Sequence, residues 1–237
     1  MRSKMIKIIS FKICPFVQRV TALLEAKNTP YDLEYISLKN KPQWFLKLSP
    51  TGQVPVLISD SGKALFESDA IMEYIDEITQ ALNPALTAEQ RAIERAWAYQ
   101  ASKHYLVQCS AMRSADNDTL ALRTEKLSDA FQRVEVQLGD GPFFNGYTLG
   151  NVDLAWMVLL YRAAIIEKHT CYDFVGKFPK VKAWQKSLLE TGIAEQSVAN
   201  DFEKAFTDFY LSYSTYLGSG ESCVNDSDTM CKLGSCC

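Results

Sequence analysis

The sequence contains only two histidines among its 237 residues, His104 and His169, and they do not form a cluster. This scarcity argues against a histidine-based metal site and against a Ser/His catalytic pair. The chain also lacks a G-x-G-x-x-G motif and a P-loop, the sequence signatures of common nucleotide-binding sites. The residue types that carry any chemistry therefore have to be sought elsewhere.

Long apolar runs and blocks of like charge are absent as well. The longest apolar run, Leu154–Tyr161, is far shorter than the roughly 20 residues that a membrane-spanning helix needs. Lys4, Lys7 and Lys12 interrupt the first residues, which leaves no apolar stretch of signal-peptide length. The 25 Lys and Arg residues are dispersed and the net charge is −3, so no footprint for nucleic acid or an anionic membrane is present. We expect a soluble cytoplasmic protein.

The seven cysteines do not have the distribution of a disulfide scaffold. Cys14, Cys109 and Cys171 lie in globular sequence, which suits a reducing compartment such as the cytosol. Four more cysteines crowd the polar segment 218–237 without zinc-knuckle spacing, and we expect this segment to be a flexible tail with no metal. These four are Cys223, Cys231, Cys236 and Cys237.

Hydrophobic periodicity divides the chain into two parts. The segment up to Ile78 alternates between strand and helix patterns and reads βαβ followed by ββα. Thr87 and Gln90 then have the spacing of a helix capping box, and the sequence from there to Leu217 shows helical stripes. The prediction is an α/β domain over residues 1–80, a linker over 81–86 and an all-helical domain over 87–217.

Cys14 is followed by Pro15 and stands between the first predicted strand and the first predicted helix. It therefore occupies the N-cap position, with proline at the first helical position. Unpaired N–H groups and the positive end of the helix dipole favour the thiolate, so we expect a lowered pKa and a reactive cysteine. The alternative is a small buried hydrophobic residue. Because Val17 stands where a second cysteine would complete a dithiol motif, an external thiol has to resolve any disulfide at Cys14.

Two further motifs offer binding groups for such a thiol. Val54-Pro55 begins a predicted strand, and a cis bond there would expose the Val54 backbone to an extended peptide; an ordinary edge proline is an equal alternative. Glu67 and Ser68 precede the next helix, whose N-terminus suits a carboxylate, while Glu67 suits an ammonium group. Ser68 as a simple helix cap is the alternative for that position.

Segments 11–19, 38–45, 52–57 and 66–68 resemble omega-class glutathione transferases in order and spacing. The sequences of these segments are FKICPFVQR, LKNKPQWF, GQVPVL and FES, respectively. The resemblance covers residues 5–77 most specifically and implies a thioredoxin-like domain followed by a helical one. The segment Asn151–Trp156 resembles the start of the buried helix of the family, although Gly150 stands where a serine or threonine cap is usual. The resemblance makes Asp153 a structural residue.

The resemblance also implies roles for individual residues. Cys14 becomes the catalytic cysteine, Lys41 meets the glycine carboxylate of glutathione, Val54 pairs with its cysteinyl backbone, and Glu67 and Ser68 hold its γ-glutamyl end. Glutathione is thus the expected cosubstrate. Candidates for the acceptor site, which could equally be core residues, are Phe202, Phe209 and Tyr210.

The implied function is a glutathione-dependent thiol transferase that works through a mixed disulfide on Cys14, with dehydroascorbate as a further acceptor by analogy. The family resemblance also implies a homodimer. Two alternatives stay open at this point: a conjugating glutathione transferase, and a non-catalytic binding or regulatory protein of the same fold.

Overall fold

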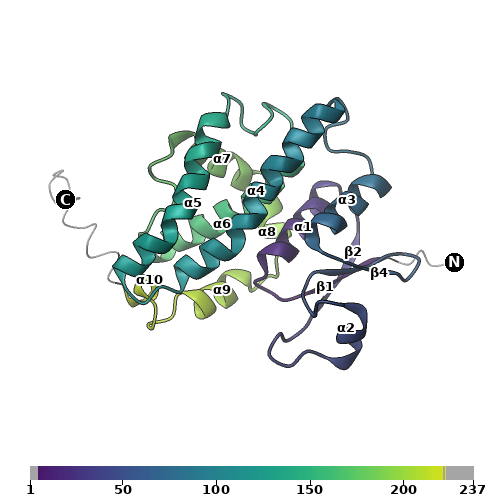
Figure 1. Cartoon of the computed structure of the whole chain (residues 1–237), viewed down its shortest axis with the longest axis horizontal. Coiled ribbons are helices and arrows are strands. Elements are labelled where there is room, and N and C mark those ends of the chain that lie inside the picture. Colours follow the sequence, from purple (N-terminus) through teal and green to yellow (C-terminus); the bar gives the residue numbers. More distant parts are fainter. Residues whose placement is uncertain (1–4, 221, 223–237) are drawn as a thin grey trace.

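The computed structural model describes residues 5–220 and 222, and its N-terminal part has the predicted βαβ-ββα order (Figure 1). A four-stranded sheet has the order β2-β1-β3-β4, in which β1 and β2 are parallel and β3 is antiparallel to both β1 and β4. One short helix was not predicted, α2. The elements are β1 (Ile6–Ser10), α1 (Pro15–Ala26), β2 (Tyr31–Tyr35), α2 (Gln43–Leu48), β3 (Val56–Ile58), β4 (Ala64–Phe66) and α3 (Ser68–Ile78).

The central strand β1 is buried on both faces, which explains why the sheet carries helices on both sides. Ile6 and Ile8 belong to the main core with α1 and α3. Ile9 belongs to a second, small core in which Phe45 of α2 is fully buried. Helix α2 therefore covers the sheet face opposite α1 and α3, as Figure 1 shows.

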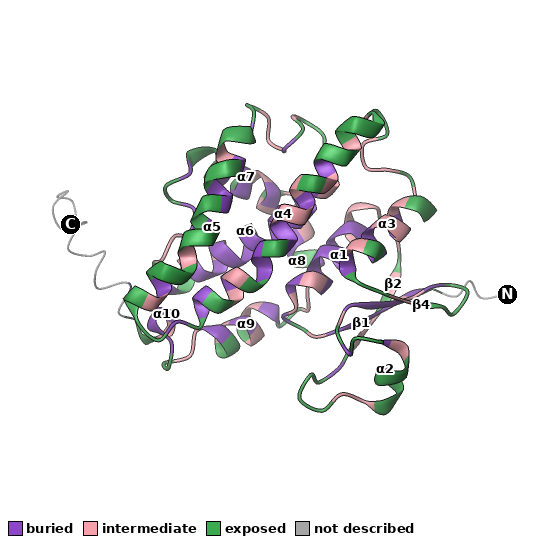
Figure 2. Cartoon of the chain, in the orientation of Figure 1, coloured by how far each residue is buried: buried purple, intermediate pink, exposed green. Residues whose placement is uncertain are grey.

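The rest of the chain is helical, as predicted, and packs around α6. Figure 2 shows α6 as the most continuously buried element at the centre of this part. The predicted capping box at the start of α4 is confirmed: Gln90 N donates to Thr87 Oγ1 at 3.2 Å, and Thr87 N donates to Gln90 Oε1 at 2.8 Å. The helices are α4 (Ala88–Met112), α5 (Asn117–Gln137), α6 (Asn151–Thr170), α7 (Pro179–Glu190), α8 (Ile193–Gln196), α9 (Phe202–Tyr210) and α10 (Tyr216–Ser219).

The N-terminus of α6 is held by two buried carboxylates. Asp153 is fully buried and accepts hydrogen bonds from Gly150 N and Phe144 N, both at 2.8 Å, and from Trp184 Nε1 at 2.7 Å. Gly150 has no capping side chain, and Glu94 of α4 fills the space instead: a Cβ atom at Gly150 would lie 1.9 Å from Glu94 Oε1. The backbone N–H groups of Asn151 and Val152 stabilise the Glu94 carboxylate. A neighbouring helix thus supplies the cap that the local sequence lacks.

The two parts of the chain share one continuous hydrophobic core. Helix α1 lies against α6 and α8, and polar contacts join them: Arg162 Nη1 donates to Gln18 Oε1, and Thr21 Oγ1 donates to Ser197 O at 2.7 Å. Helix α3 ends at Ile78 and α4 begins at Ala88, so the predicted linker over 81–86 falls between them. The division into two domains stays a prediction.

The described structure continues past Leu217, where the flexible tail was predicted to begin. Helix α10 extends to Ser219, and Ser222 Oγ donates a hydrogen bond to Thr170 O at 2.6 Å. The four cysteines predicted for the tail lie outside the described residues. Among residues 5–220, no helix combines the length and the hydrophobicity that crossing a membrane requires.

We predict that Glu94 makes stability depend on pH. Burial, with Asp153 and Asp76 nearby, raises the pKa of Glu94 from 4.5 to about 7. The folded protein therefore favours the protonated carboxyl, and this contribution to stability is complete below pH 4.5 and is lost as the pH rises to about 7. Glu94→Gln removes the titration, so urea unfolding should show the variant gaining stability relative to wild type across this interval.

The exposed Glu125 of α5 provides the control for this experiment, since Glu125→Gln removes the same charge from the surface. The difference in unfolding free energy from wild type should depend on pH more strongly for Glu94→Gln than for Glu125→Gln. Parallel pH profiles for Glu94→Gln and wild type would show that the buried carboxyl does not titrate in this interval.

Candidate active site

Cys14 stands at the N-terminus of α1, as the sequence predicts. It is the N-cap residue, in an extended conformation, and Pro15 is the first residue of the helix. Its Sγ lies 4.0 Å from Val54 O, and its side chain is half-buried. The turn before the helix is closed by a hydrogen bond from Cys14 N to Phe11 O at 2.9 Å. The thiol is thus fixed between the end of β1 and the segment that precedes β3.

The expectation of a lowered thiol pKa is wrong for this structure. Burial is the largest influence and raises the pKa of Cys14 above its ordinary value of 9.0. The backbone N–H groups of Val17 and Phe16 and the charge of Arg162 lower the pKa, but they do not offset the burial. The helix N-terminus acts in the predicted direction, and the cost of removing water from the thiolate outweighs it.

The predicted glutathione-binding residues all line one cavity of about 370 Å³ together with Cys14. Lys41 comes from the loop before α2, and Val54 comes from the segment before β3, where the Val54-Pro55 peptide bond is cis. Glu67 is the N-cap of α3, and Ser68 is its first residue. The cavity therefore has one cationic side chain and two acidic side chains, Glu67 and Asp69, among its lining residues, and a helix N-terminus at its wall.

The backbone at Glu67 is unusual, because its φ is 66° and its ψ is 117°. A non-glycine residue in such a region costs on the order of 1–3 kcal/mol, and residues of this kind concentrate at functional sites. Glu67 is exposed, whereas Ser68 is buried. The strained turn thus places an exposed carboxylate directly beside a helix N-terminus.

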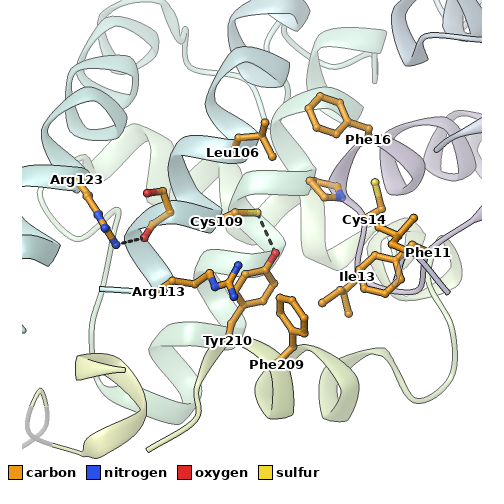
Figure 3. A pocket seen from close by; sticks show the side chains of 13 residues that line it. Phe11, Ile13, Cys14, Phe16, Leu106, Cys109, Arg113, Arg123, Phe209 and Tyr210 are labelled. Carbon is orange, nitrogen blue, oxygen red and sulfur yellow. Dashed lines mark hydrogen bonds between the residues drawn. The ribbon is translucent and has the colours of Figure 1, made fainter. Parts of the chain in front are cut away.

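A second cavity of about 580 Å³ also borders Cys14, and we call it the aromatic cavity because four aromatic side chains line it (Figure 3). Phe209 and Tyr210, two of the predicted acceptor-site residues, line it with Phe11 and Phe16. The third, Phe202, does not: its side chain is 1% exposed and stacks between Tyr161 and Phe206 in the core. Phe202 is therefore a core residue.

Several polar residues at the site were not predicted. Cys109 lines the aromatic cavity and accepts a hydrogen bond from Tyr210 Oη at 3.2 Å, and Arg113 and Arg123 line the same cavity. Arg162 is buried in α6, where its Nη2 donates to Ile13 O at 3.4 Å and its guanidinium lies 5.3 Å from the ring of Phe202. An arginine that directly ends the longest apolar run was the available signal for Arg162.

Comparison with known proteins assigns the chain to a protein family. Residues 13–78 match the family model described as glutathione S-transferase, N-terminal domain. The probable glutathione S-transferase DHAR1, cytosolic, of Oryza sativa subsp. japonica is 36% identical over 160 residues, which cover 66% of this chain and 70% of that protein. The chain belongs to the glutathione S-transferase family.

Further relatives place this glutathione S-transferase near the omega class. Glutathione S-transferase omega-1 of Sus scrofa is 28% identical over 212 residues, or 87% of this chain and 86% of that protein. The structure of glutathione transferase Omega 3C from Trametes versicolor superposes with a TM-score of 0.71, 22% identity and coverage of 82% of this chain and 89% of that one. The structural likeness shows that the fold is that of a glutathione S-transferase.

We predict that this transferase has a thiol at Cys14 that reacts faster as the pH rises above neutrality. Because burial disfavours the thiolate, the rate of alkylation by iodoacetamide should increase with pH to a midpoint above the ordinary cysteine pKa of 9.0. Peptide mass mapping separates labelling at Cys14 from labelling at Cys109. A midpoint below pH 7 would show that the helix N-terminus and Arg162 outweigh burial.

Proposed function

We propose that the protein is a glutathione-dependent thiol transferase with Cys14 as its nucleophile. In the first step the Cys14 thiolate attacks the glutathione sulfur of a mixed disulfide, forms a Cys14–glutathione disulfide and releases the acceptor as a thiolate. In the second step the thiolate of another glutathione attacks the glutathionyl sulfur. Oxidised glutathione leaves, and the Cys14 thiolate returns. Each step exchanges one S–S bond for another, so no outside oxidant or reductant is needed.

One observation carries this proposal: the Cys14 side chain lines both cavities. The smaller cavity offers charged groups and a helix N-terminus, which suit a zwitterionic peptide, and the larger one offers aromatic surface. In the first step the attacked glutathione sulfur lies between Cys14 and the leaving sulfur of the acceptor, so the site for glutathione and the site for the acceptor must both border Cys14. The arrangement around Cys14 meets this requirement.

The smaller cavity supports the assignment of glutathione as the cosubstrate. Lys41 would meet the glycine carboxylate, and the backbone of Val54 would pair with the cysteinyl residue as a short added strand. The N-terminus of α3 and the Ser68 hydroxyl would both bind the γ-glutamyl carboxylate, and Glu67 would bind the ammonium group. Solved relatives include a rice glutathione S-transferase in complex with glutathione, with 24% identity and a TM-score of 0.73.

Conjugation is less favoured by the chemistry of Cys14. A conjugating enzyme stabilises the thiolate of bound glutathione with a group that does not react with it, whereas a thiol in that position forms a disulfide. We include the reduction of dehydroascorbate as a second acceptor reaction, since relatives named DHAR match 66–78% of this chain.

We further propose that the protein acts in the cytoplasm as a homodimer. Exposed apolar side chains on β4, α3 and α4, namely Phe66, Ile78 and Ile93, support an interface on that side of the molecule. Sedimentation at micromolar protein should give a mass of twice 26.7 kDa. A single 26.7 kDa species would contradict the dimer.

The central prediction separates chemistry from binding. Cys14→Ser should abolish disulfide exchange, because a hydroxyl cannot form the mixed disulfide, and should leave glutathione binding within about twofold of wild type. Kinetics with a glutathionylated peptide and calorimetry with glutathione measure the two properties. Full exchange activity in Cys14→Ser would refute the mechanism.

The converse variants are Glu67→Ala and Ser68→Ala. Each removes a contact to a charged group of glutathione worth about 1.5–3 kcal/mol, so the Kd for glutathione should rise roughly ten- to a hundredfold. The alkylation rate of Cys14 should stay nearly unchanged. Glu77→Ala is the matched control, because Glu77 is exposed on the same helix and does not line the cavity. Unchanged glutathione binding in both variants would show that the site is misplaced.

A further inference from the structure

The charged side chains that line the aromatic cavity are all of one sign. Arg113 and Arg123 are the only charged side chains among its described lining residues, and both are cationic. The protein as a whole has a net charge of −3, so this concentration of positive charge does not reflect the average surface. Cationic and aromatic side chains in one cavity indicate a ligand with an anionic group at one end and an apolar body.

Neither arginine is neutralised by an ion pair within the described part of the chain. The Arg113 guanidinium lies 5.3 Å from the centre of the Phe209 ring, which holds it over an aromatic face of the cavity. Arg123 Nη1 donates to Ser110 O at 3.1 Å and to Ser114 Oγ at 3.5 Å. Both charges are thus positioned by neutral groups and stay available to an anion.

Asp116, an acidic residue close enough to feel the charge of Arg123, is already engaged. Asp116 caps α5 by accepting a hydrogen bond from Thr119 N at 2.7 Å, and this bond is the main reason that its pKa is lowered. The charge of Arg123 is a smaller influence on the same carboxylate. Asp116 does not line the cavity, so it does not occupy the place of a bound anion.

The arginines and the reactive thiol belong to different walls of the cavity. Figure 3 shows Phe11, Ile13, Cys14 and Phe16 on one side, with Cys109 and Arg113 on the other. Arg113 is the C-cap residue of α4 and Arg123 belongs to α5, whereas Cys14 begins α1. An acceptor whose mixed disulfide with glutathione lies at Cys14 would lay its body along the aromatic side chains and direct its far end toward the arginines.

We propose that the acceptor site selects thiols with an aromatic or apolar body and an anionic group at the end away from the sulfur, held by Arg113 and Arg123. This inference rests on the proposed thiol transfer and specifies its acceptor. Guanidinium groups bind carboxylates through short, charge-assisted hydrogen bonds, so a carboxylate is the simplest anion to test.

The experiment compares two mixed disulfides of glutathione, one with 4-mercaptobenzoate and one with 4-mercaptobenzamide. They have nearly the same shape and differ in the charge at the far end. The wild-type protein should have the higher kcat/KM for the carboxylate. The double variant Arg113→Gln/Arg123→Gln should lose this preference, with kcat/KM for the carboxylate lower by about tenfold or more and kcat/KM for the amide within about twofold.

Arg133→Gln is the matched control, because Arg133 is exposed on α5 and does not line the cavity. It removes one positive charge from the same helix as Arg123 and should leave the carboxylate-to-amide ratio at the wild-type value. The Michaelis constant for glutathione should stay the same in all three proteins, which confirms that the variants fold and keep the glutathione site.

Two results would overturn the inference in different ways. If the wild type and the double variant turn over both disulfides with the same carboxylate-to-amide ratio, the selection of anionic acceptors is wrong and thiol transfer stands. If wild type turns over neither disulfide, the proposed thiol transfer fails, and the acceptor specificity fails with it.

Discussion

The position of Cys14 depends on how α1 is held between the two parts of the chain. Arg162 of α6 donates to Gln18 within α1 and to the carbonyl of Ile13, the residue directly before the thiol. Gln18 Nε2 in turn donates to Ala194 O at 3.4 Å, and Thr21 donates to Ser197 O. These groups are buried, so leaving any of them unpaired costs on the order of 1–3 kcal/mol. The cysteine is therefore held from the helical part even though it belongs to the sheet part.

This arrangement has an electrostatic consequence for the thiol. Packing α1 against α6 brings the cation of Arg162 close, which favours the thiolate, but it also removes water, which disfavours the thiolate more strongly. The thiol that lines both cavities thus ionises less readily than that of a free cysteine. Such a thiol is shielded from indiscriminate oxidation and reacts with a substrate that the two cavities orient.

Local sequence determines only part of this design. The Cys14-Pro15 cap, the Thr87 capping box and the order of strands and helices follow from neighbouring residues, and each was predicted from them. Helix α2 was missed because it is a short helix fixed by packing of Phe45 on the sheet. Glu94 at the start of α6 was missed because that cap comes from a residue far away in the chain.

The aromatic residues of α9 show the same limit: Phe202, Phe206 and Tyr210 recur every four residues on the buried face, and Phe209 falls on another face. Helical periodicity separates these faces, but only the packed structure shows that Tyr210 of the buried face and Phe209 of the other face both line the cavity.

The central claim is that Cys14 carries glutathione during the reaction. Peptide mass mapping after exposure of the full chain to oxidised glutathione tests it most directly. The account predicts one glutathione on the peptide that contains Cys14, removed by excess reduced glutathione. An adduct on Cys109 with an unmodified Cys14 would contradict the account.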